Sequence, residues 1–512
     1  MERELKLELP DDHLDRLRDL PALSSLRIGR PHDELHVNTY FDTADFELHR
    51  HQLSLRVSRN GDRLVQTLKT QGRRRAGLFE REEYESAIAG ETPELDALLG
   101  MVPKQSASAR LIGDAGLASR LKPVFATHVR RTVSQLRLPH GEEVELALDR
   151  GELLAGHVRA PIHEVEMEIK KGEPDRLYGI VMEMLAVVPL RISRLSKGER
   201  GYALIGGEEP EAVHAQTVKL GKRDSVRDAF HCIAQNCLAQ VYGNERGVIA
   251  NGSNAAACVH QMRVGLRRLR SALDMFAPGI VCPDALQQEI KWVAGELGAA
   301  RDWEVLAHAT LPEALADAPK NIHANALQET ASERAGENRR RAARAVDSVR
   351  YTRLVIELNH WLDNVGKGAG LEPDIREALG ASALKFARKR LRARHRKLMK
   401  RGRRLPKLDA QRRHQARIAA KKLRYATEFF ASLYSRQRLR LYRAVLSSLQ
   451  DDLGWRNDVA VADGLLSALQ ADRPKIAIGA GFVRGYLIAR VAADQKALRR
   501  LWKRFRSTYP PA

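Results

Sequence analysis

The start of the chain alternates charged and apolar residues in a pattern suited to binding a metal and a phosphate. One parity is taken by Glu2, Glu4, Lys6 and Glu8, and leucines occupy the positions between the last three of them and after Glu8. In an extended strand, residues two apart point to the same face, so the carboxylates and the lysine share one side. Carboxylate oxygens are ligands for hard divalent cations, and a lysine ammonium binds phosphate oxygens. The segment therefore predicts a strand with a metal- and phosphate-binding face.

A second segment repeats this alternation. Glu164, Glu166 and Glu168 share one parity, and three apolar residues take the other. For either strand alone, an antiparallel sheet with one solvated face explains the pattern. The set as a whole favours a site, because a solvated face does not require three carboxylates and a lysine within eight residues. A closed barrel with inward polar residues would gather such groups around one substrate.

The elements that would hold these residues are mostly strands. Residues 1–205 contain five segments that alternate with period two, and turn signals such as Asn60-Gly61-Asp62 separate several of them. Further charged residues on such alternating stretches are Arg56, Lys69, Arg81, Glu83 and Arg131. We therefore predict an antiparallel domain in which both signs of charge point to one side.

From about residue 225 onward the pattern becomes helical, and two of the predicted helices carry a cationic stripe. On a helix of 3.6 residues per turn, the first stripe falls within an arc of about 80°. It consists of His260, Arg263, Arg267 and Arg270, and the second stripe contains His414, Arg417, Lys421, Lys422 and Arg424. Apolar residues lie on the other side of the first helix, so it is amphipathic.

Three explanations of the stripes differ in the partner they require. A solvated basic face needs none, but we interpret each stripe as lacking acidic residues four positions on, where they would relieve like-charge repulsion. A nucleic-acid surface is disfavoured because aromatic residues are 5% of the chain and no RNA- or DNA-binding motif is present. A flexible polyanion fits best. Each histidine is either a phosphate contact or a core histidine bonded to the backbone.

The two stripes belong to an internal repeat. His260 matches His414 at an offset of 154, and the segment Leu297-Gly-Ala-Ala-Arg-Asp matches Leu453-Gly-Trp-Arg-Asn-Asp at an offset of 156. Two matches in the same order and at nearly one offset predict two homologous helical halves. We expect these halves to pack with pseudo-two-fold symmetry.

Charge divides the chain in the same way as the periodicity. The formal net charge is +22, yet residues 1–210 hold 31 Lys and Arg against 35 Asp and Glu, whereas residues 211–512 hold 55 against 29. The helical part therefore carries the whole excess and predicts an acidic partner. A length of 512 residues predicts two or three domains.

The remaining composition bears on compartment. The four cysteines show no metal-ligand spacing, so we interpret them as small core residues of a reducing compartment. The N-terminus is charged from its second residue, which argues against a signal peptide. We also expect no apolar run near the roughly 20 residues that span a bilayer. These observations predict a soluble cytoplasmic protein without a membrane partner.

Residues 1–205 resemble the CYTH domain, the triphosphate tunnel metalloenzyme family. Glu2-x-Glu4-x-Lys6 matches the family's ExExK signature, and further motifs follow in order. These are Tyr40-Phe-Asp-Thr, Leu55-Arg56-Val, Thr67-Leu-Lys69, Arg81-x-Glu83-Tyr84, Leu148-Asp149-x-Gly151, Glu164-x-Glu166-x-Glu168 and Ser196-Lys197-x-x-Arg200-Gly-Tyr202. The resemblance implies an antiparallel β-barrel whose tunnel binds triphosphate.

The resemblance also implies roles for individual residues. Metal would be held by Glu2 and Glu4, with help from Glu164, Glu166 or Glu168. Phosphate oxygens would be bound by Lys6, Arg56, Lys69, Arg131 and Lys197. The chain departs from the family where Ser58 stands in place of a frequent arginine, and Arg59 has the opposite parity. The attacking water would be activated either by a second metal or by a carboxylate such as Glu83.

Residues 222–505 resemble the CHAD domain, a histidine-containing α-helical family. The matching residues are His260-x-x-Arg263-Val, Arg267-Arg268-Leu-Arg270, Leu297-Gly with Arg301-Asp302, and His414 with Lys421-Lys422-Leu-Arg424-Tyr425. The resemblance implies two four-helix bundles around a basic groove that binds inorganic polyphosphate.

The combined prediction is a multidomain chain with a CYTH tunnel over residues 1–205, a linker over 206–221 and a helical domain over 222–505. This order resembles that of bacterial inorganic triphosphatases. We expect Mg²⁺- or Mn²⁺-dependent hydrolysis of inorganic triphosphate, polyphosphate binding by the helical domain, and association with polyphosphate granules. The alternatives are an adenylate cyclase, a nucleoside or thiamine triphosphatase on the same fold, or a polyphosphate-binding protein without catalysis. The sequence predicts no oligomeric state.

Overall fold

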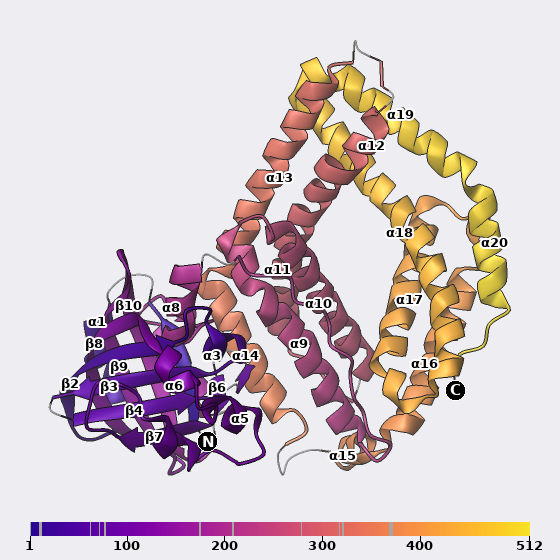
Figure 1. Ribbon diagram of the computed structural model, residues 1–512. Helices are drawn as coiled ribbons and strands as arrows, with labels where there is room; N and C mark the ends of the chain where they lie inside the picture. Colours follow the sequence, from indigo (N-terminus) through magenta and orange to yellow (C-terminus); the bar gives the residue numbers. More distant parts are fainter. Residues whose placement is uncertain are drawn as a thin grey trace. The chain divides into compact units, whose positions relative to one another are not determined.

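The computed structural model describes most of the chain (Figure 1). The described residues are 2–9, 13–61, 63–70, 72–75, 78–173, 176–206, 209–277, 279–316, 318–319, 322–367 and 372–511, without the side chains of residue 2 and residues 73–75. The chain forms two compact units. The N-terminal unit contains residues 1–208 and 347–363, and the helical unit contains residues 209–346 and 364–512.

The N-terminal unit is built on one curled antiparallel sheet (Figure 1). Its strands are β1 (Glu2–Glu8), β2 (Arg27–Asp42), β3 (Ser54–Asn60), β4 (Arg63–Lys69), β5 (Arg73–Arg75), β6 (Leu78–Arg81), β7 (Glu83–Ala87), β8 (Lys122–Arg137), β9 (Glu143–Ala155), β10 (Val158–Lys171) and β11 (Arg191–Ile192). The hydrogen-bonded order is β5-β6-β1-β10-β9-β8-β2-β3-β4-β7, with β11 beside β1. This arrangement confirms the predicted antiparallel sheet.

The consecutive strands β6 and β7 connect the two opposite edges of the sheet. Strand β6 pairs with β1, strand β7 pairs with β4, and only Glu82 separates β6 from β7. The sheet therefore curls around on itself, so that one of its faces is turned toward an enclosed interior.

The apolar side of the sheet is turned outward and covered by helices. Leu5 and Leu7 of β1 are fully buried, and the apolar residues of β3 and β4 form a core with α4 (Leu95–Leu99), α5 (Ala107–Ile112) and α6 (Leu117–Arg120). The unit also contains α1 (Leu14–Arg18), α2 (Pro21–Ser24), α3 (Glu47–Arg50), α7 (Leu177–Leu185) and α8 (Lys197–Gly206). Because period two separates the faces, covering the apolar side forces the charged side into the interior.

The helical unit has two halves that follow the sequence repeat (Figure 1). The first half packs α9 (Val226–Ala250), α10 (Ala255–Phe276), α11 (Asp284–Val305) and α13 (Ala324–Val346). The second half packs α16 (Ala383–Arg401), α17 (Ala410–Phe429), α18 (Arg436–Asp472) and α20 (Gln495–Arg506). Shorter or connecting helices are α12 (Leu311–Leu315), α15 (Pro373–Gly380) and α19 (Ala477–Ala493).

The residues before α9 and α16 touch in a reciprocal way. The Val226 amide donates to the Ala381 carbonyl at 2.9 Å, and the Ala383 amide donates to the Asp224 carbonyl at 2.9 Å. Residues 226 and 383 are both donors, residues 224 and 381 are both acceptors, and each of these two sets is related by an offset of 157, so the two halves exchange places between the two bonds. Such an exchange requires a local two-fold axis, which supports the predicted pseudo-symmetry of the two halves.

The domain boundaries differ from the predicted 1–205, 206–221 and 222–505 in two places. Residues 209–221 of the expected linker belong to the helical unit, where Asn244 holds both backbone groups of Val213 and Asn236 donates to the Gln216 carbonyl. Helix α14 (Val349–Asn364) groups with the N-terminal unit, in which Asp347 lies 3.0 Å from Arg191. Helical periodicity does not show which unit a helix packs in. From its position in the sequence alone, α14 is expected in the helical domain.

The expectation about apolar runs needs a correction. Among the described residues, Pro474–Ala493 is long and apolar enough to cross a bilayer by length and composition, with a mean hydropathy of 1.4 over its most apolar window. Only 28% of that window is buried in the structure. A single segment of this kind is weak evidence for a membrane span, and Arg484 within it is ion-paired with Asp463 at 2.6 Å.

Candidate functional site

A polar cavity of about 410 Å³ occupies the interior of the curled sheet, and we call it the tunnel. Nine of the residues predicted for the first site line it. They are Glu4, Lys6, Arg56, Lys69, Glu83, Arg131, Glu166, Glu168 and Lys197. Glu164 lies behind this lining and is fully buried, and the side chain of Glu2 is outside the described part of the structure.

The tunnel wall contains a cluster of three buried carboxylates around one lysine. Oxygens of Asp149, Glu164 and Glu166 lie within 4.8 Å of one another. The Lys197 ammonium is 2.8, 2.6 and 2.8 Å from them, respectively. Burial lowers the pKa of Lys197, but these three carboxylates outweigh it and hold the pKa well above 10.5. The cluster is therefore a cation site that the chain fills with its own ammonium group.

Register explains why these groups meet. Glu164 lies opposite Asp149 across β10 and β9, and Arg131 lies opposite Asp149 across β8 and β9. The Arg131 guanidinium donates to both Asp149 oxygens at 2.8 and 2.7 Å and to Glu166 at 2.6 Å. Lys197 enters from the first position of α8. Adjacent strands and one helix start thus place opposite charges in contact.

Glu166 is the most heavily contacted acid of the tunnel. Besides Lys197 and Arg131, the Lys6 ammonium reaches it at 2.5 Å. Burial would raise the Glu166 pKa, but the charges of Lys197, Lys6 and Arg131 hold it well below 4.5. The carboxylate is therefore ionised at neutral pH.

Two further groups of charges line the same interior. Glu4 is held by Arg81 at 2.8 Å and by Lys6 at 3.0 Å, and it lies directly opposite Glu168 in the β1–β10 register. On another wall, Glu83 lies 2.9 Å from Lys69 and 3.7 Å from Arg56. Seven cations and eight carboxylates line the tunnel in all, so its charge is nearly balanced.

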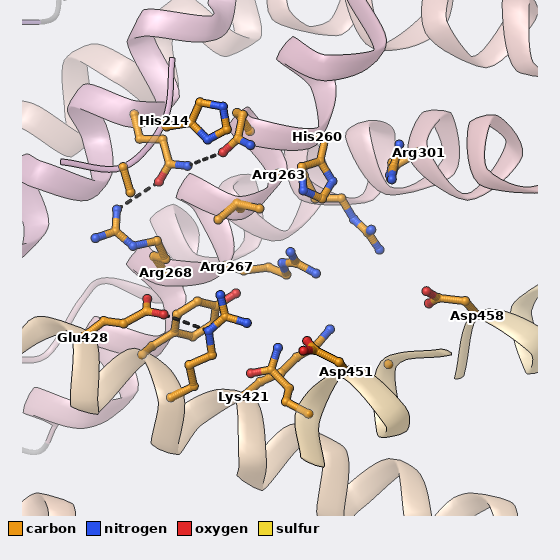
Figure 2. A pocket seen from close by; sticks show the side chains of 18 of the residues that line it. His214, His260, Arg263, Arg267, Arg268, Arg301, Lys421, Glu428, Asp451 and Asp458 are labelled. Atoms are coloured by element: carbon orange, nitrogen blue, oxygen red, sulfur yellow. Dashed lines mark hydrogen bonds and ion pairs between the residues drawn. The ribbon is translucent and has the colours of Figure 1, made fainter. Parts of the chain in front are cut away.

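The helical unit contains a larger cavity of about 750 Å³, and we call it the groove. Figure 2 shows Arg263, Arg267 and Arg268 on one side and Lys421 on the facing helix. Eight Lys and Arg residues line the groove against four acids. The cations are Arg263, Arg267, Arg268, Arg301, Arg417, Lys421, Arg424 and Arg443, and the acids are Asp302, Glu428, Asp451 and Asp458.

The repeat is visible in the ion pairs of the groove. Arg263 lies 3.3 Å from Asp302, and the equivalent Arg417 lies 3.9 Å from Asp458. Each half therefore contributes one arginine–aspartate pair, and the other cations of the groove provide its excess positive charge.

Crowding of like charges is strongest at Lys421. Burial, followed by the charges of Arg267 and Arg417, lowers the Lys421 pKa from 10.5 to about 7. Burial and neighbouring arginines, of which Arg301 is the largest influence, lower the His260 pKa to about 4. An anion in the groove would relieve both shifts.

The comparisons with known proteins agree with this division of the chain. Residues 1–202 match the family model of the CYTH domain, and residues 232–467 match that of the CHAD domain. The chain is a CYTH domain followed by a CHAD domain. The two resemblances noted in the sequence are thereby confirmed.

Two relatives support the assignment. The CHAD domain of the plant Ricinus communis is 37% identical, covers 59% of this chain and 98% of its own, and has a TM-score of 0.52. A Haemophilus influenzae protein named inorganic triphosphatase is 33% identical over 168 residues. That match covers 33% of this chain and 45% of the relative, so the chain spans about half the length of this curated relative.

Several residues predicted for the CHAD groove lie outside it. Arg270 and His414 are exposed, and Lys422 is 2.8 Å from Asp274; none of the three is among the residues that line the cavity. Arg424 lies 2.8 Å from Glu428 four residues on, so the expectation of stripes without such acidic partners is wrong. Each predicted cationic stripe covers an arc of the helix that includes residues beside the groove as well as residues that line it.

Sequence reasoning missed two residues of the CYTH tunnel as site members. Asp149 lies in a matched motif and Arg81 on an alternating stretch, but neither pattern indicates a role for them; both line the cavity. Their signal was register, since Asp149 lies opposite Arg131. The departure at Ser58 is accommodated by a hydrogen bond to Asn38 at 2.6 Å, while Arg59 pairs with Glu91 outside the cavity.

Proposed function

We propose that the CYTH domain hydrolyses inorganic triphosphate to pyrophosphate and phosphate with Mg²⁺ or Mn²⁺. The observation that carries this proposal is the Lys197 ammonium enclosed by Asp149, Glu164 and Glu166. Three buried carboxylates that already hold a cation form an oxygen donor set of the kind that hard divalent cations prefer. The name of the Haemophilus influenzae relative agrees with the activity.

Charge balance explains why a metal is needed. The tunnel's cations and carboxylates nearly cancel, so a triphosphate adds roughly four to five uncompensated negative charges. When phosphate oxygens take the ammonium and guanidinium groups, the carboxylates that held them lose their partners. A divalent metal at Asp149, Glu164 and Glu166 would neutralise those carboxylates and polarise phosphate oxygens.

The chain's own residues then bind and orient the substrate. Lys6, Arg131 and Lys197 hold non-bridging oxygens in the charged form, which withdraws negative charge from the terminal phosphorus. A water oxygen bonds to that phosphorus while the bond to the bridging oxygen breaks, and pyrophosphate leaves with the bridging oxygen. We assign the water's proton to Glu83, which lines the tunnel apart from the three-carboxylate cluster.

The lining favours triphosphate itself over a nucleotide. Among the described residues, the apolar side chains that line the tunnel are Val129, Val133 and Ala147, with Tyr40 stacked on Phe125 at 4.4 Å. This set offers no broad apolar surface for a base.

The experiment compares phosphate release from triphosphate, ATP and long-chain polyphosphate, each with Mg²⁺, Mn²⁺ or a chelator. Metal-dependent cleavage of triphosphate well above that of ATP supports the proposal. Faster cleavage of ATP would assign the tunnel to a nucleotide, and absence of any cleavage would leave a binding protein.

For the CHAD domain we propose binding of inorganic polyphosphate in the groove. The excess of cations in the groove supports this, because it requires an anion rather than a metal to balance it. Contributions from both halves suit a chain that crosses between them. Arg267→Gln with Lys421→Gln should weaken polyphosphate binding at least ten-fold at low salt, whereas Lys422→Gln should change it little. If both variants weakened binding equally, polyphosphate would not bind specifically in the groove, and the proposal would fail.

A further inference from the structure

A second group of cations lies on the outer side of α16 and α20. Ten exposed Lys and Arg side chains lie between Lys385 and Lys407, and α20 exposes Lys496, Arg499, Arg500, Lys503, Arg504 and Arg506. The chain has no Asp or Glu between Glu377 and Asp409, and none after Asp494. We call these sixteen side chains the outer basic face.

The two helices form one surface. Helix α20 packs through its apolar side mainly on α18 (Figure 1), and it also reaches α16, where the Phe505 ring centroid lies 5.3 Å from that of His395 and Trp502 covers Gly402. This packing buries Leu498, Trp502 and Phe505 and leaves the six cations of α20 exposed. The face is about 28 Å long, because α16 has 19 residues at about 1.5 Å each.

The outer basic face is separate from the groove. None of the groove-lining residues comes from Lys385–Lys407 or from α20. The face also differs from two partly buried arginines of α13, where Arg334 pairs with Asp472 and Arg339 pairs with Glu304. Within the described residues, no ion pair involves any of the sixteen side chains of the face.

Like charges this dense repel one another. On α20, residues four apart such as Lys496 and Arg500 carry the same sign, which destabilises a helix. Packing of α20 requires only its apolar side, so the fold does not account for the uniform sign of the other side. An anionic partner does.

The surroundings indicate which kind of anion fits. No large apolar side chain of Lys385–Lys407 or of α20 is exposed, so the face offers nothing to insert into a bilayer. Trp502 and Phe505 are buried and Phe386 and His395 are partly buried, so these segments present no exposed aromatic ring for stacking bases. A partner recognised by phosphate charge alone matches the face.

We propose that the outer basic face is a second binding site for long-chain polyphosphate. This inference rests on the proposed function, in which the groove binds the same polymer. Helix α17 lines the groove and packs on α16, so a polyphosphate held in the groove is at high local concentration near the face. The second contact then adds affinity for long chains without a new partner. Short chains, which cannot reach both sites, bind the groove alone.

The test uses the full-length protein with a chelator, and short and long sodium polyphosphates as probes. The face variant combines Arg392→Gln, Arg396→Gln, Arg499→Gln and Lys503→Gln. Its control removes the same charge at exposed positions elsewhere, with Lys291→Gln, Arg340→Gln, Arg344→Gln and Lys475→Gln. The groove variant is Arg267→Gln with Lys421→Gln.

We expect the face variant to lose about ten-fold or more in affinity for the long chain at low salt, with a shallower salt dependence. Its affinity for the short chain and all properties of the control should stay within about two-fold. Unchanged long-chain binding by the face variant, or an equal loss in the control, overturns the inference. Loss of duplex RNA binding with polyphosphate binding intact assigns the face to nucleic acid instead.

The two proposals fail in different ways. If the groove variant loses all binding and the face variant none, the second site is excluded while the groove stands. If the unmodified protein binds neither chain, the groove proposal itself fails. Circular dichroism of each variant shows whether it is folded.

Discussion

The Lys197 ammonium nitrogen lies 2.8 Å from a carboxylate oxygen of Asp149, deep in the CYTH tunnel. Both side chains are nearly or fully excluded from solvent, at 8% and 0% exposure. An isolated carboxylate at this depth would be costly, so the lysine stabilises the tunnel as well as lining it. The same ammonium competes with any metal for the three-carboxylate cluster.

Replacing Lys197 by methionine should therefore separate stability from metal binding. Three buried carboxylates lose their shared cation, so the metal-free protein should be less stable by about 3–5 kcal/mol. Mn²⁺ should bind more tightly and restore much of the loss, because its competitor is gone. Triphosphate hydrolysis should fall at least about a hundred-fold. Thermal unfolding with and without Mn²⁺ measures this, and a variant as stable as the parent with unchanged Mn²⁺ affinity contradicts it.

Arg56 and Arg59 provide a matched pair three residues apart on β3. Arg56 lines the tunnel near Glu83, whereas Arg59 pairs with Glu91 outside it. Arg56→Ala should reduce kcat/KM for triphosphate about a hundred-fold, since a charged contact to phosphate is lost. Arg59→Ala should reduce it less than two-fold. Steady-state kinetics of both variants measure the two effects. A large decrease in kcat/KM for Arg59→Ala would contradict the assignment of Arg56, and not Arg59, to phosphate binding in the tunnel.

Binding to the groove should depend on pH through Lys421. The lowered pKa, about 7, means that the folded free protein carries fewer protons here than the unfolded chain as pH rises toward 10.5. The free protein therefore gains stability with rising pH across that window. A bound polyanion favours the charged lysine, so polyphosphate affinity should fall as pH rises above about 7 and binding should take up a proton.

Calorimetry in buffers of different ionisation enthalpy counts that proton. Lys421→Met should remove the uptake and flatten the pH profile. The neighbouring Lys422→Met should not, because Lys422 is paired with Asp274 and does not line the groove. If Lys421→Met still takes up a proton on binding polyphosphate, the proton binds to another group.

Two glycines of the CYTH domain should respond oppositely to alanine. At Gly151 a Cβ would lie 2.0 Å from the His128 carbonyl oxygen of the adjacent strand. Gly151→Ala should therefore destabilise the domain by about 1–3 kcal/mol, because backbone must move. Gly179 is exposed within α7 and its Cβ would meet nothing within 4 Å, so Gly179→Ala should stabilise by about 0.5–1 kcal/mol. Thermal unfolding of both variants measures the signs, and equal signs would refute the packing assigned to Gly151.

Period-two patterning was enough to place some site residues. Glu4 and Lys6 line the tunnel and Leu5 and Leu7 are buried, as their parity predicts. When a strand buries its apolar face, the residues at alternate positions must point to the opposite face, here the tunnel. The pattern does not reveal the site role of Asp149, because its partners lie on β8 and β10. The register between strands cannot be read from the sequence of one strand.

The helical half shows the complementary limit. The repeat predicted facing halves, and the Arg263–Asp302 and Arg417–Asp458 pairs follow it. Helical angles could not decide between groove and flank, since Arg270 and Arg267 differ by only about 60° yet only Arg267 lines the cavity. The grouping of α14 with the CYTH domain depends on tertiary contacts that no local pattern encodes.

The most direct test of the account follows both products of triphosphate hydrolysis in the full-length protein and two variants. We predict equal amounts of phosphate and pyrophosphate with Mg²⁺ or Mn²⁺, and no reaction with chelator. Glu166→Gln should abolish the reaction, because the Lys197, Lys6 and Arg131 contacts converge on that carboxylate. The groove variant Arg267→Gln with Lys421→Gln should keep it. Full activity of folded Glu166→Gln, or activity that is lost only in the groove variant, would contradict the assignment of catalysis to the tunnel.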